Sequence, residues 1–346
     1  MTGKIGGTHA GAVRVPGGPI AFATVMNPPD LAERLFSRGG EALRIAGTIP
    51  LNQAPFPTLE SAEAREALAR ADVLITGWGA PALSDRDLDA APRLRYVLHA
   101  GGQAAPLLPQ SAIRRGIEVS NAGWVNAIPV AEYTLAMIVL ACKEAFRARR
   151  LYAERRHHID REAEFPEAGS VGKTIGVVGA SRIGRIVIER LGGLDVRVQL
   201  YDPFLEASEA IRLGARLVSL DEVMVTSDIV TLHPPLNATT VGMITARHLA
   251  LLRDGATLIN TSRGPVVDQQ ALIRELRTGR IEAILDVTDP DVLPPDSVLY
   301  TLPNVFLTPH ISGSMGTEIR RLGDHVASEL QRVVAGQPLA FPEILR

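Results

Sequence analysis

The sequence predicts an α/β protein built from two doubly wound parallel-sheet domains, and three observations support this. The chain has 346 residues, which at roughly 150 residues per domain suggests two domains. Short apolar runs alternate with segments of helical periodicity, the pattern of a parallel sheet covered on both faces. This alternation ends near residue 121 and starts again at residue 174, so it occurs twice.

The composition excludes several classes of protein. A hydrophobic fraction of 46% and a charged fraction of 21% are typical of a globular chain, not a disordered one. The net charge of −2 gives no indication of a nucleic-acid partner. Cys142 is the single cysteine, so no disulfide can form within the chain, and the most apolar run, Tyr133–Cys142, is too short to span a bilayer. We therefore expect a soluble, cytoplasmic protein with no membrane partner and a flexible tail over residues 1–19.

The first half is expected to contain five short apolar strands, at Ala21–Val25, Leu43–Ala46, Val73–Thr76, Tyr96–His99 and Glu118–Ser120. Helical spacing is clear in Ser61–Arg70 and Leu107–Arg115, and a long helix is expected from Asn126 to about Arg155. The polar segment after it, Arg155–Gly169, contains paired histidines that could ligate a metal. Because no third ligand is evident, we interpret the segment as a charged loop and expect no metal site.

The second half is expected to contain six strands, at Thr174–Val178, Arg197–Tyr201, Asp228–Leu232, Thr257–Thr261, Ala283–Val287 and Val305–Thr308. A helix over Arg185–Leu191 follows the first of them, and the last helix is expected at Thr317–Val334. Open α/β sheets bind ligands at the carboxyl ends of their strands, so residues that directly follow these strands are the candidate site.

A glycine turn follows the first strand of the second half. Gly179 would make the tight turn, and Gly184 would allow close packing of the next helix on the strand. A pyrophosphate would then lie on the N-terminus of that helix. Ser181 replaces the middle glycine of the dinucleotide pattern. Its Cβ crowds the phosphate, although its hydroxyl can donate to it. We expect Arg182 and Ile183, within the same motif, to contact the cofactor as well.

Asp202 strengthens this interpretation, because it ends the next strand, 18 residues beyond Gly184. A carboxylate there hydrogen-bonds a ribose diol and repels a 2′-phosphate. No arginine lies beside it to accept such a phosphate, so NAD is predicted in preference to NADP. The structural alternative is a doubly wound domain with a turn glycine and a capping aspartate.

Three later segments also place polar residues just beyond apolar strands. They are Asn260-Thr261-Ser262-Arg263-Gly264, Asp286-Val287-Thr288-Asp289-Pro290-Asp291, and Thr308-Pro309-His310. In this order after a dinucleotide motif, they make the chain resemble the D-isomer-specific 2-hydroxyacid dehydrogenase family. The resemblance covers most of the chain from Ala21 onward and is strongest from Gly172 to His310.

This resemblance implies that Arg263 binds the substrate carboxylate and that His310 is the general acid/base, paired with an acidic residue. Arginine offers a two-pronged grip on a carboxylate, and histidine titrates near neutral pH. The family usually has glutamate where this chain has Asp291, whose side chain is one methylene shorter. We favour Asp291 as the partner of His310, with Asp289 as the second candidate. Alternatively, Asp291 is a turn residue and His310 is unpaired.

Further residues are expected at the site through the same resemblance. The backbone N–H groups of Ala100 and Gly101 match a glycine loop that holds the substrate carboxylate, although Gln103 replaces the aspartate common after it. Trp78 could cover the substrate or belong to the core. The remaining cofactor contacts are expected at His233, Pro235, Thr240, Thr261 and Asp286. Of these, His233 is not expected to be a catalyst, and Asp286 could instead make a structural hydrogen bond.

The domain organisation also follows from the resemblance. It implies a discontinuous, flavodoxin-like substrate domain, residues 1–123 and 312–346, into which a Rossmann NAD-binding domain, residues 124–311, is inserted. It further implies a homodimer. The predicted activity is hydride transfer between nicotinamide and C2 of a small 2-oxo or D-2-hydroxy acid. Two alternatives remain open: an NAD(H)-responsive binding module of the corepressor type, and a dehydrogenase for an unusual acid such as a phosphonate or a sugar acid.

Overall fold

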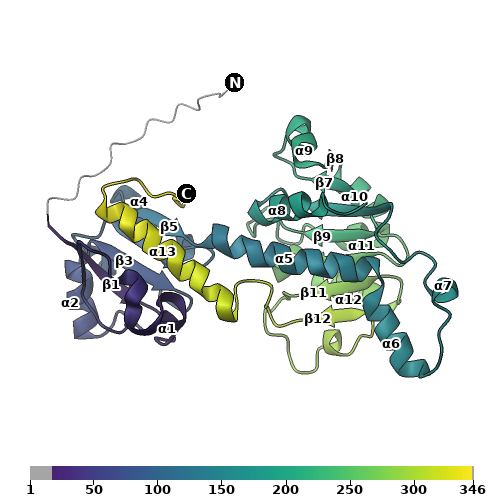
Figure 1. Cartoon of the computed structure of the whole chain (residues 1–346), viewed down its shortest axis with the longest axis horizontal. Coiled ribbons are helices and arrows are strands. Elements are labelled where there is room, and N and C mark those ends of the chain that lie inside the picture. Colours follow the sequence, from purple (N-terminus) through teal and green to yellow (C-terminus); the bar gives the residue numbers. More distant parts are fainter. Residues whose placement is uncertain (1–17, 345–346) are drawn as a thin grey trace. The chain divides into compact units, whose positions relative to one another are not determined.

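The chain forms two compact units in a computed structural model that describes residues 18–344. One unit comprises Met1–Asn126 and Met315–Arg346, and the other comprises Ala127–Ser314. The first unit is therefore discontinuous in sequence, with the second inserted into it (Figure 1). The expected domain crossings, after residues 123 and 311, fall shortly before these boundaries. Most of the expected flexible tail lies outside the described residues.

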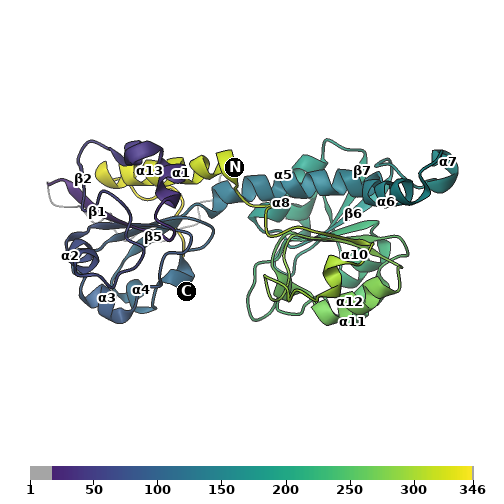
Figure 2. The same cartoon turned by 90° about the horizontal axis from the view of Figure 1, so that it is seen from below.

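The first unit is a five-stranded parallel sheet of order β2-β1-β3-β4-β5, the flavodoxin-like order. Its strands are β1 (Ile20–Val25), β2 (Thr48–Pro50), β3 (Val73–Gly77), β4 (Tyr96–Ala100) and β5 (Glu118–Asn121). Helices α1 (Leu31–Phe36) and α13 (Ile319–Val334) cover one face, and α2 (Ala62–Arg70), α3 (Asp85–Asp89) and α4 (Ser111–Arg114) cover the other (Figure 2). Short 3₁₀ helices η1 (Arg38–Leu43), η2 (Ala105–Leu107) and η5 (Gly316–Glu318) complete this unit.

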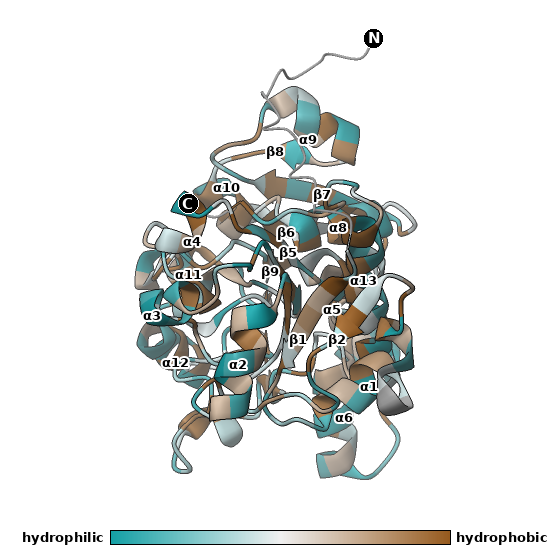
Figure 3. Cartoon of the chain, turned by 90° about the vertical axis from the view of Figure 1, so that its left-hand side faces the viewer, coloured by the Kyte–Doolittle hydropathy of each residue, from teal (hydrophilic) through white to brown (hydrophobic). Residues whose placement is uncertain are grey.

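Alternation along the strands divides the core of this unit into two layers. Along β3 and β4, Ile75 and Leu98 face α1 and α13, whereas Leu74 and Val97 face the other helices. Because both faces are covered, the strands have a continuous apolar sequence, as the sequence analysis assumed. Helix α2, by contrast, carries both hydrophilic and hydrophobic residues (Figure 3), since only one side of it meets the sheet.

The second unit is a seven-stranded parallel sheet of order β12-β11-β10-β9-β6-β7-β8. The strands are β6 (Lys173–Val178), β7 (Val196–Tyr201), β8 (Arg216–Leu217), β9 (Ile229–Leu232), β10 (Thr257–Asn260), β11 (Glu282–Leu285) and β12 (Val305–Leu307). The chain runs outward from β6 to β8 and then returns to β9 on the other side of β6. This reversal is the topological switch point at which Rossmann sheets bind dinucleotides.

Helices cover both faces of the second sheet. Helices α5 (Gly123–Cys142), α8 (Arg182–Leu191) and α9 (Ala207–Leu213) pack on one face, and α10 (Leu220–Thr226), α11 (Ala246–Leu251) and α12 (Gln269–Arg277) pack on the other. The other helical segments are α6 (Ala145–Arg155), α7 (Arg161–Glu164), η3 (Gly264–Val266) and η4 (Val298–Tyr300). Two doubly wound parallel-sheet units are therefore present, as predicted.

Several element predictions were wrong in detail. The second strand is Thr48–Pro50 and not Leu43–Ala46, because Leu43 ends η1 and buries its side chain in the core of the first unit. The expected helix at Leu107–Arg115 is reduced to η2 and the four-residue α4. The expected loop after α6 contains the short helix α7.

The long helix expected from Asn126 begins earlier and is broken. It begins at Gly123 and ends at Cys142, and a new helix begins after Glu144, whose φ of 49° lies in the left-handed region. No proline or glycine marks this break. Immediately beyond it, the ring of Phe146 packs on the ring of Phe306, with centroids 4.5 Å apart. A tertiary contact therefore accompanies the change in direction.

Helix α5 extends the apolar run Tyr133–Cys142 toward the N-terminus. By length and composition alone this 20-residue helix could cross a membrane, although the run Tyr133–Cys142 by itself is too short. The same properties belong to core helices of soluble proteins. Ala131, Ile138 and Cys142 of α5 are buried against Ile175 and Val187 in the core of the second unit.

Candidate active site

The expected site residues of the second unit lie at one edge of its sheet. All strands of this sheet are parallel, so their carboxyl ends meet there. The residues that follow β6, β7, β9, β10, β11 and β12 include, in that order, Gly179, Asp202, His233, Arg263, Asp286 and His310. Residues separated by up to 131 positions in sequence (310 − 179 = 131) therefore share one edge.

The glycine turn between β6 and α8 requires glycine at both ends. Gly179 has a φ of 96°, and a Cβ on it would lie 2.8 Å from the backbone nitrogen of Pro234. A Cβ on Gly184 would lie 2.1 Å from the carbonyl oxygen of Gly179. Ser181 is the N-cap of α8, and its hydroxyl accepts a hydrogen bond from the Gly184 N–H at 3.3 Å. The helix thus begins at Arg182, and its first N–H groups and its dipole favour an anion such as a pyrophosphate.

Asp202 lies directly beside this turn. One carboxylate oxygen accepts the Ala180 N–H at 2.8 Å, and the other accepts the Phe204 N–H at 2.9 Å. The carboxylate is therefore held in place by the backbone of the glycine turn and of its own loop. Each oxygen has a further lone pair to accept a hydroxyl of a ribose.

His233 is a buried, uncharged residue beneath the glycine turn. Its Nε2 lies 2.9 Å from the Thr231 hydroxyl, and Nδ1 has no partner in the described part of the chain. Burial lowers the pKa of His233 to about 3, so the imidazole is neutral near pH 7. Pro235 and Thr240 belong to the loop that follows, where the Thr240 hydroxyl donates to the Pro235 carbonyl oxygen at 2.6 Å.

Arg263 is exposed at the end of β10, and its backbone is fixed by Asn260. The Asn260 side chain donates to the Arg263 carbonyl oxygen at 3.0 Å and accepts the Ser262 N–H at 3.0 Å. The guanidinium donates to the Ser262 carbonyl oxygen at 2.7 Å. Within residues 18–344, no carboxylate lies within ion-pair distance of Arg263. Its charge is therefore available for an anionic ligand.

The side chains of His310 and Asp291 lie within hydrogen-bond distance of each other. Nδ1 of His310 lies 3.1 Å from one carboxylate oxygen of Asp291 and 3.4 Å from the other. Both side chains are partly exposed, at 46% and 62%. His310 itself has a φ of 56°, in the left-handed region. With Nδ1 turned to the carboxylate, Nε2 is the ring nitrogen left to face a substrate.

The loop that carries Asp291 is fixed from below, which allows an aspartate to reach the histidine. A Cβ on Gly264 would lie 1.9 Å from the carbonyl oxygen of Thr288, so the loop backbone lies directly on this glycine. The Gln269 side chain accepts the Asp289 N–H at 2.8 Å and donates to the Asp289 carbonyl oxygen. Asp289 is therefore held by its backbone, while the Asp291 carboxylate turns to His310.

Asp286 holds the segment that carries His310. Its carboxylate, 1% exposed, accepts the Thr308 hydroxyl at 2.6 Å and the N–H groups of Ile311 and Ser312, both at 2.8 Å. The Asp286 carbonyl oxygen accepts the His310 N–H at 2.9 Å. Asp286 therefore makes structural hydrogen bonds, which is the alternative to a cofactor contact that the sequence left open for it.

Helix α5 also supports this edge through two hydroxyl contacts. The Thr134 hydroxyl lies 2.9 Å from the Thr261 hydroxyl, and the Tyr133 hydroxyl lies 2.9 Å from the Thr308 hydroxyl. The Thr261 side chain, expected at the cofactor, is 3% exposed and turned toward α5. Burial is the largest influence on Tyr133 and raises the pKa of its phenol, so the hydroxyl keeps its proton.

The first unit presents its own candidate residues at the carboxyl edge of its sheet. Ala100 ends β4, and a Cβ on Gly101 would lie 2.3 Å from Nε2 of the buried His99. Nδ1 of His99 lies 2.9 Å from the Thr76 hydroxyl, and burial lowers the pKa of His99 to about 4. Trp78 follows β3 and is 37% exposed, so its side chain is not part of the core.

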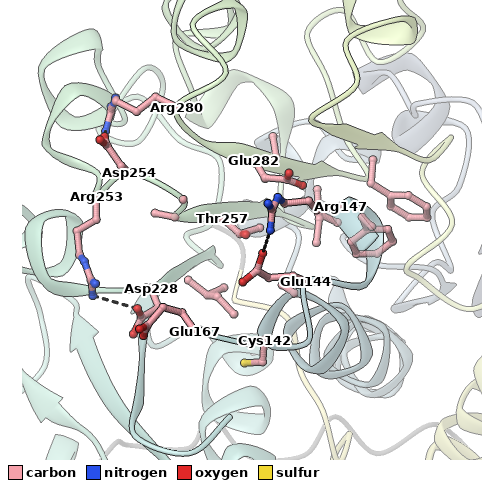
Figure 4. A pocket seen from close by; sticks show the side chains of 18 of the residues that line it. Cys142, Glu144, Arg147, Glu167, Asp228, Arg253, Asp254, Thr257, Arg280 and Glu282 are labelled. Carbon is pink, nitrogen blue, oxygen red and sulfur yellow. Dashed lines mark hydrogen bonds and ion pairs between the residues drawn. The ribbon is translucent and has the colours of Figure 1, made fainter. Parts of the chain in front are cut away.

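A separate cavity of about 740 Å³ lies at the opposite edge of the second sheet. Residues at the amino ends of the strands line it, among them Lys173, Thr257 and Glu282. Figure 4 shows that its cations turn to carboxylates: Arg253 lies 3.0 Å from Asp228, and Arg147 lies 2.9 Å from Glu144. This cavity is therefore distinct from the candidate active site.

Sequence reasoning missed the residues that position the site, namely Asn260, Gln269, Thr134 and Tyr133. Their roles depend on contacts made across strands and helices. Asn260 alone carried a local signal, because an Asn at a strand end often bonds the backbone two or three residues on. Among the described residues, no group of three His, Cys, Asp or Glu side chains could hold a metal ion.

The fold and the edge residues together define a dinucleotide-binding protein of the Rossmann type. Comparison with known proteins identifies the family. Residues 135–312 match the family model described as D-isomer specific 2-hydroxyacid dehydrogenase, NAD binding domain. The chain belongs to this family, and its second unit is an NAD-binding domain.

Relatives agree with this assignment. The chain is 34% identical to a D-3-phosphoglycerate dehydrogenase of Mycobacterium leprae over 78% of its own length, but it spans only 51% of that relative. It is 34% identical to a glyoxylate reductase of Korarchaeum cryptofilum, covering 70% of this chain and 74% of the relative. Among solved structures, a phosphoglycerate oxidoreductase from Rhizobium etli is similar at 25% identity, with a TM-score of 0.77 and coverage of 94% of this chain and 97% of that one. The chain thus spans about half the length of the phosphoglycerate dehydrogenases that it matches.

Proposed function

We propose that the chain is an NAD-dependent dehydrogenase that interconverts a small 2-oxo acid and its D-2-hydroxy acid. The observation that carries the proposal is the pairing of His310 with Asp291 at the edge that also presents Arg263, which has no carboxylate partner among the described residues. The glycine turn at Gly179 and the carboxylate of Asp202 would hold the pyrophosphate and the ribose of NAD. When bound, NAD supplies or accepts the hydride.

Residues of the chain would bind the substrate carboxylate and transfer a proton to and from the carbonyl oxygen. Arg263 would bind the substrate carboxylate and polarise the carbonyl group. His310 would give a proton from Nε2 to the carbonyl oxygen during reduction and take it back during oxidation. Asp291 accepts from Nδ1, which fixes the orientation of the ring and stabilises its charged form. Backbone N–H groups of Ala100 and Gly101 would hold the carboxylate from the first unit.

The substrate is proposed to be an acid without a phosphate group. Phosphate sites in proteins commonly contain arginine or lysine. The segments that directly follow the strands of the first unit contain no arginine, lysine or histidine; they are residues 26–30, 51–57, 78–84, 101–109 and 122–126. Of the two substrates that relatives are named for, glyoxylate therefore fits this chain better than 3-phosphoglycerate.

The test is NADH oxidation with a panel of 2-oxo acids: glyoxylate, hydroxypyruvate, pyruvate, a branched acid and 3-phosphohydroxypyruvate. We expect turnover on the small uncharged-tail acids. His310→Ala should reduce kcat by about 10²–10⁴-fold, the usual contribution of a general acid/base, with little change in NADH affinity. The exposed His157→Ala variant is the matched control. Tight NADH binding without turnover on any acid would contradict the proposal and favour a binding module.

We also propose that the protein is a homodimer formed through the second unit. Helix α5 exposes Val139 and Leu140 at 39% and 38% while its opposite side packs on the sheet. Sedimentation analysis of the wild type and of a Leu140→Glu variant tests this. A monomeric wild type would contradict it. The cytoplasmic location stays a prediction from the sequence.

A further inference from the structure

The segment after α13, residues 340–343, returns to the loop that follows β4. After α13, Pro342 forms an antiparallel bridge with Ser120 of β5, and the Glu343 N–H donates to the Val119 carbonyl oxygen at 2.7 Å. The start of this segment is fixed by Glu329, a carboxylate 1% exposed that accepts the N–H groups of Ala340 and Phe341, both at 3.0 Å. The segment therefore lies along the edge of the sheet in a defined position.

This position places the Glu343 carboxylate against the glycine loop. One oxygen accepts the Ala104 N–H at 2.8 Å and the side chain of Asn121 at 2.6 Å, and the other accepts the Ala105 N–H at 3.1 Å. Ala104 is the N-cap of η2 and has no side-chain acceptor of its own. Glu343 thus supplies acceptors for the first N–H groups of η2, which has no side-chain cap of its own.

The loop needs such support. Its residues 101 and 102 are both glycine, which is the residue with the greatest backbone freedom, and residues 100–110 contain no acidic side chain. At its start Gly101 lies close to the buried His99 ring, where a Cβ would come within 2.3 Å of Nε2. At its end the only described carboxylate bound to it is that of Glu343. Glu343 is therefore the side-chain anchor that the structure describes for this loop.

We propose that Glu343 is a positioning residue for substrate binding: it fixes the glycine loop so that the N–H groups of Ala100 and Gly101 are aimed at the substrate carboxylate. This inference rests on the proposed function of the loop. Glu343 itself touches neither substrate nor cofactor in this scheme. Its effect should therefore fall on the substrate KM, since preorganised donors lower the cost of binding.

The test is Glu343→Gln. The amide keeps one acceptor but turns an NH₂ group toward N–H donors, so at least one of the three hydrogen bonds is lost. Two measurements are made on the full-length protein. Amide hydrogen exchange should accelerate at Ala104 and Ala105, and the KM for the best 2-oxo acid should rise about tenfold with less change in kcat. The NADH dissociation constant should stay within about twofold, because the glycine turn at Gly179 belongs to the other unit.

Two further variants make the result interpretable. Glu66→Gln removes an exposed carboxylate on α2 of the same unit and should change neither measurement. Glu343→Asp keeps the charge. Its amide exchange should be slower and its KM lower than those of Glu343→Gln, although neither should reach the wild-type value.

Unchanged exchange at Ala104 and Ala105 would overturn the proposed anchoring. Faster exchange with an unchanged KM would overturn the link to substrate. If the wild type turns over no 2-oxo acid, the proposed function fails and the link to substrate fails with it. The exchange measurement then still decides whether Glu343 holds the loop, so the two failures are distinguishable.

Discussion

At the scale of single residues, the candidate site depends on side chains whose partners are mostly backbone groups. Asp202, Asp286 and Asn260 each hold a loop by accepting or donating two or more hydrogen bonds. Arg263 differs, because the only described hydrogen bond of its guanidinium is to the carbonyl oxygen of its neighbour Ser262. A charged group left free beside fixed loops is the arrangement expected of a ligand-binding residue.

Replacing Arg263 tests its role as the carboxylate clamp. Arg263→Lys keeps the charge but loses the planar fork, so we expect kcat/KM to fall by about 100-fold. Steady-state kinetics on the best 2-oxo acid measure this. Arg277→Lys, on the exposed side of α12, is the control and should be near normal. Kinetics of Arg263→Lys equal to those of the control would contradict the clamp.

Replacing Asp202 tests its role in cofactor choice. Asp202→Ala removes the carboxylate that would repel a 2′-phosphate, so the preference of kcat/KM for NADH over NADPH should narrow by about tenfold or more. Asp195→Ala changes an exposed aspartate just before the same strand and should leave the ratio unchanged. A ratio that stays constant in Asp202→Ala would exclude the ribose role.

At the scale of elements, the sequence predicted most strands and the order of the units, but not every boundary. The second strand was predicted at Leu43–Ala46 from an apolar run. The residues that pair with β1 at the sheet edge are instead Thr48–Pro50. Three residues at an edge need little apolar surface, so periodicity does not mark them. The break at Glu144 had no local signal either, and the neighbouring ring contact of Phe146 is tertiary.

The loop between β11 and β12 shows how tertiary structure adjusts a site element. An aspartate at position 291 is short for its role, but the loop lies on Gly264 and is clamped by Gln269. Gln269→Ala should let this loop move, lowering kcat/KM by about tenfold. Gln270→Ala, exposed and adjacent, is the matched control.

A double-mutant cycle decides whether Gln269 acts through the acid. If it does, Gln269→Ala should have little further effect in an Asp291→Asn background, because the pair acts as one unit. If the losses of kcat/KM, expressed as free energies, add up in the double variant, Gln269 acts independently of Asp291.

At the scale of the whole molecule, burial lowers the pKa of histidines in both units, His99 and His325 in the first and His233 in the second. In the first unit, burial lowers the pKa of His99 from 6.5 to about 4 and also lowers that of His325. Well above pH 6.5, the imidazole of each of these histidines is neutral in both the folded and the unfolded chain. As pH falls toward 4, the unfolded chain binds the proton first, so the stability of this unit is lost across that window.

This linkage gives a measurable pH dependence. Between pH 7 and pH 5, His99 should cost about 2 kcal/mol of unfolding free energy. Trp78 and Trp124, the two tryptophans of the chain, both lie in the first unit, so tryptophan fluorescence in urea reports on that unit. His99→Asn keeps a polar group near Thr76 and should flatten the slope with pH, whereas His157→Asn should not. If the unfolding free energy of His99→Asn changes with pH as steeply as that of the wild type, buried His99 is not the source of the pH dependence.

The sequence alone predicted the class of fold and the NAD-binding motif, and its resemblance to a known family implied Arg263, His310 and the acidic loop as site residues. The strands and the glycine turn are local features, which periodicity and glycine positions predict. Only the tertiary structure decided that the Asp291 carboxylate meets His310, that Asp286 and Thr261 turn inward, and that Glu343 reaches the glycine loop 239 positions earlier (343 − 104 = 239). Such contacts depend on strand order and packing, which bring together side chains that no sequence spacing relates.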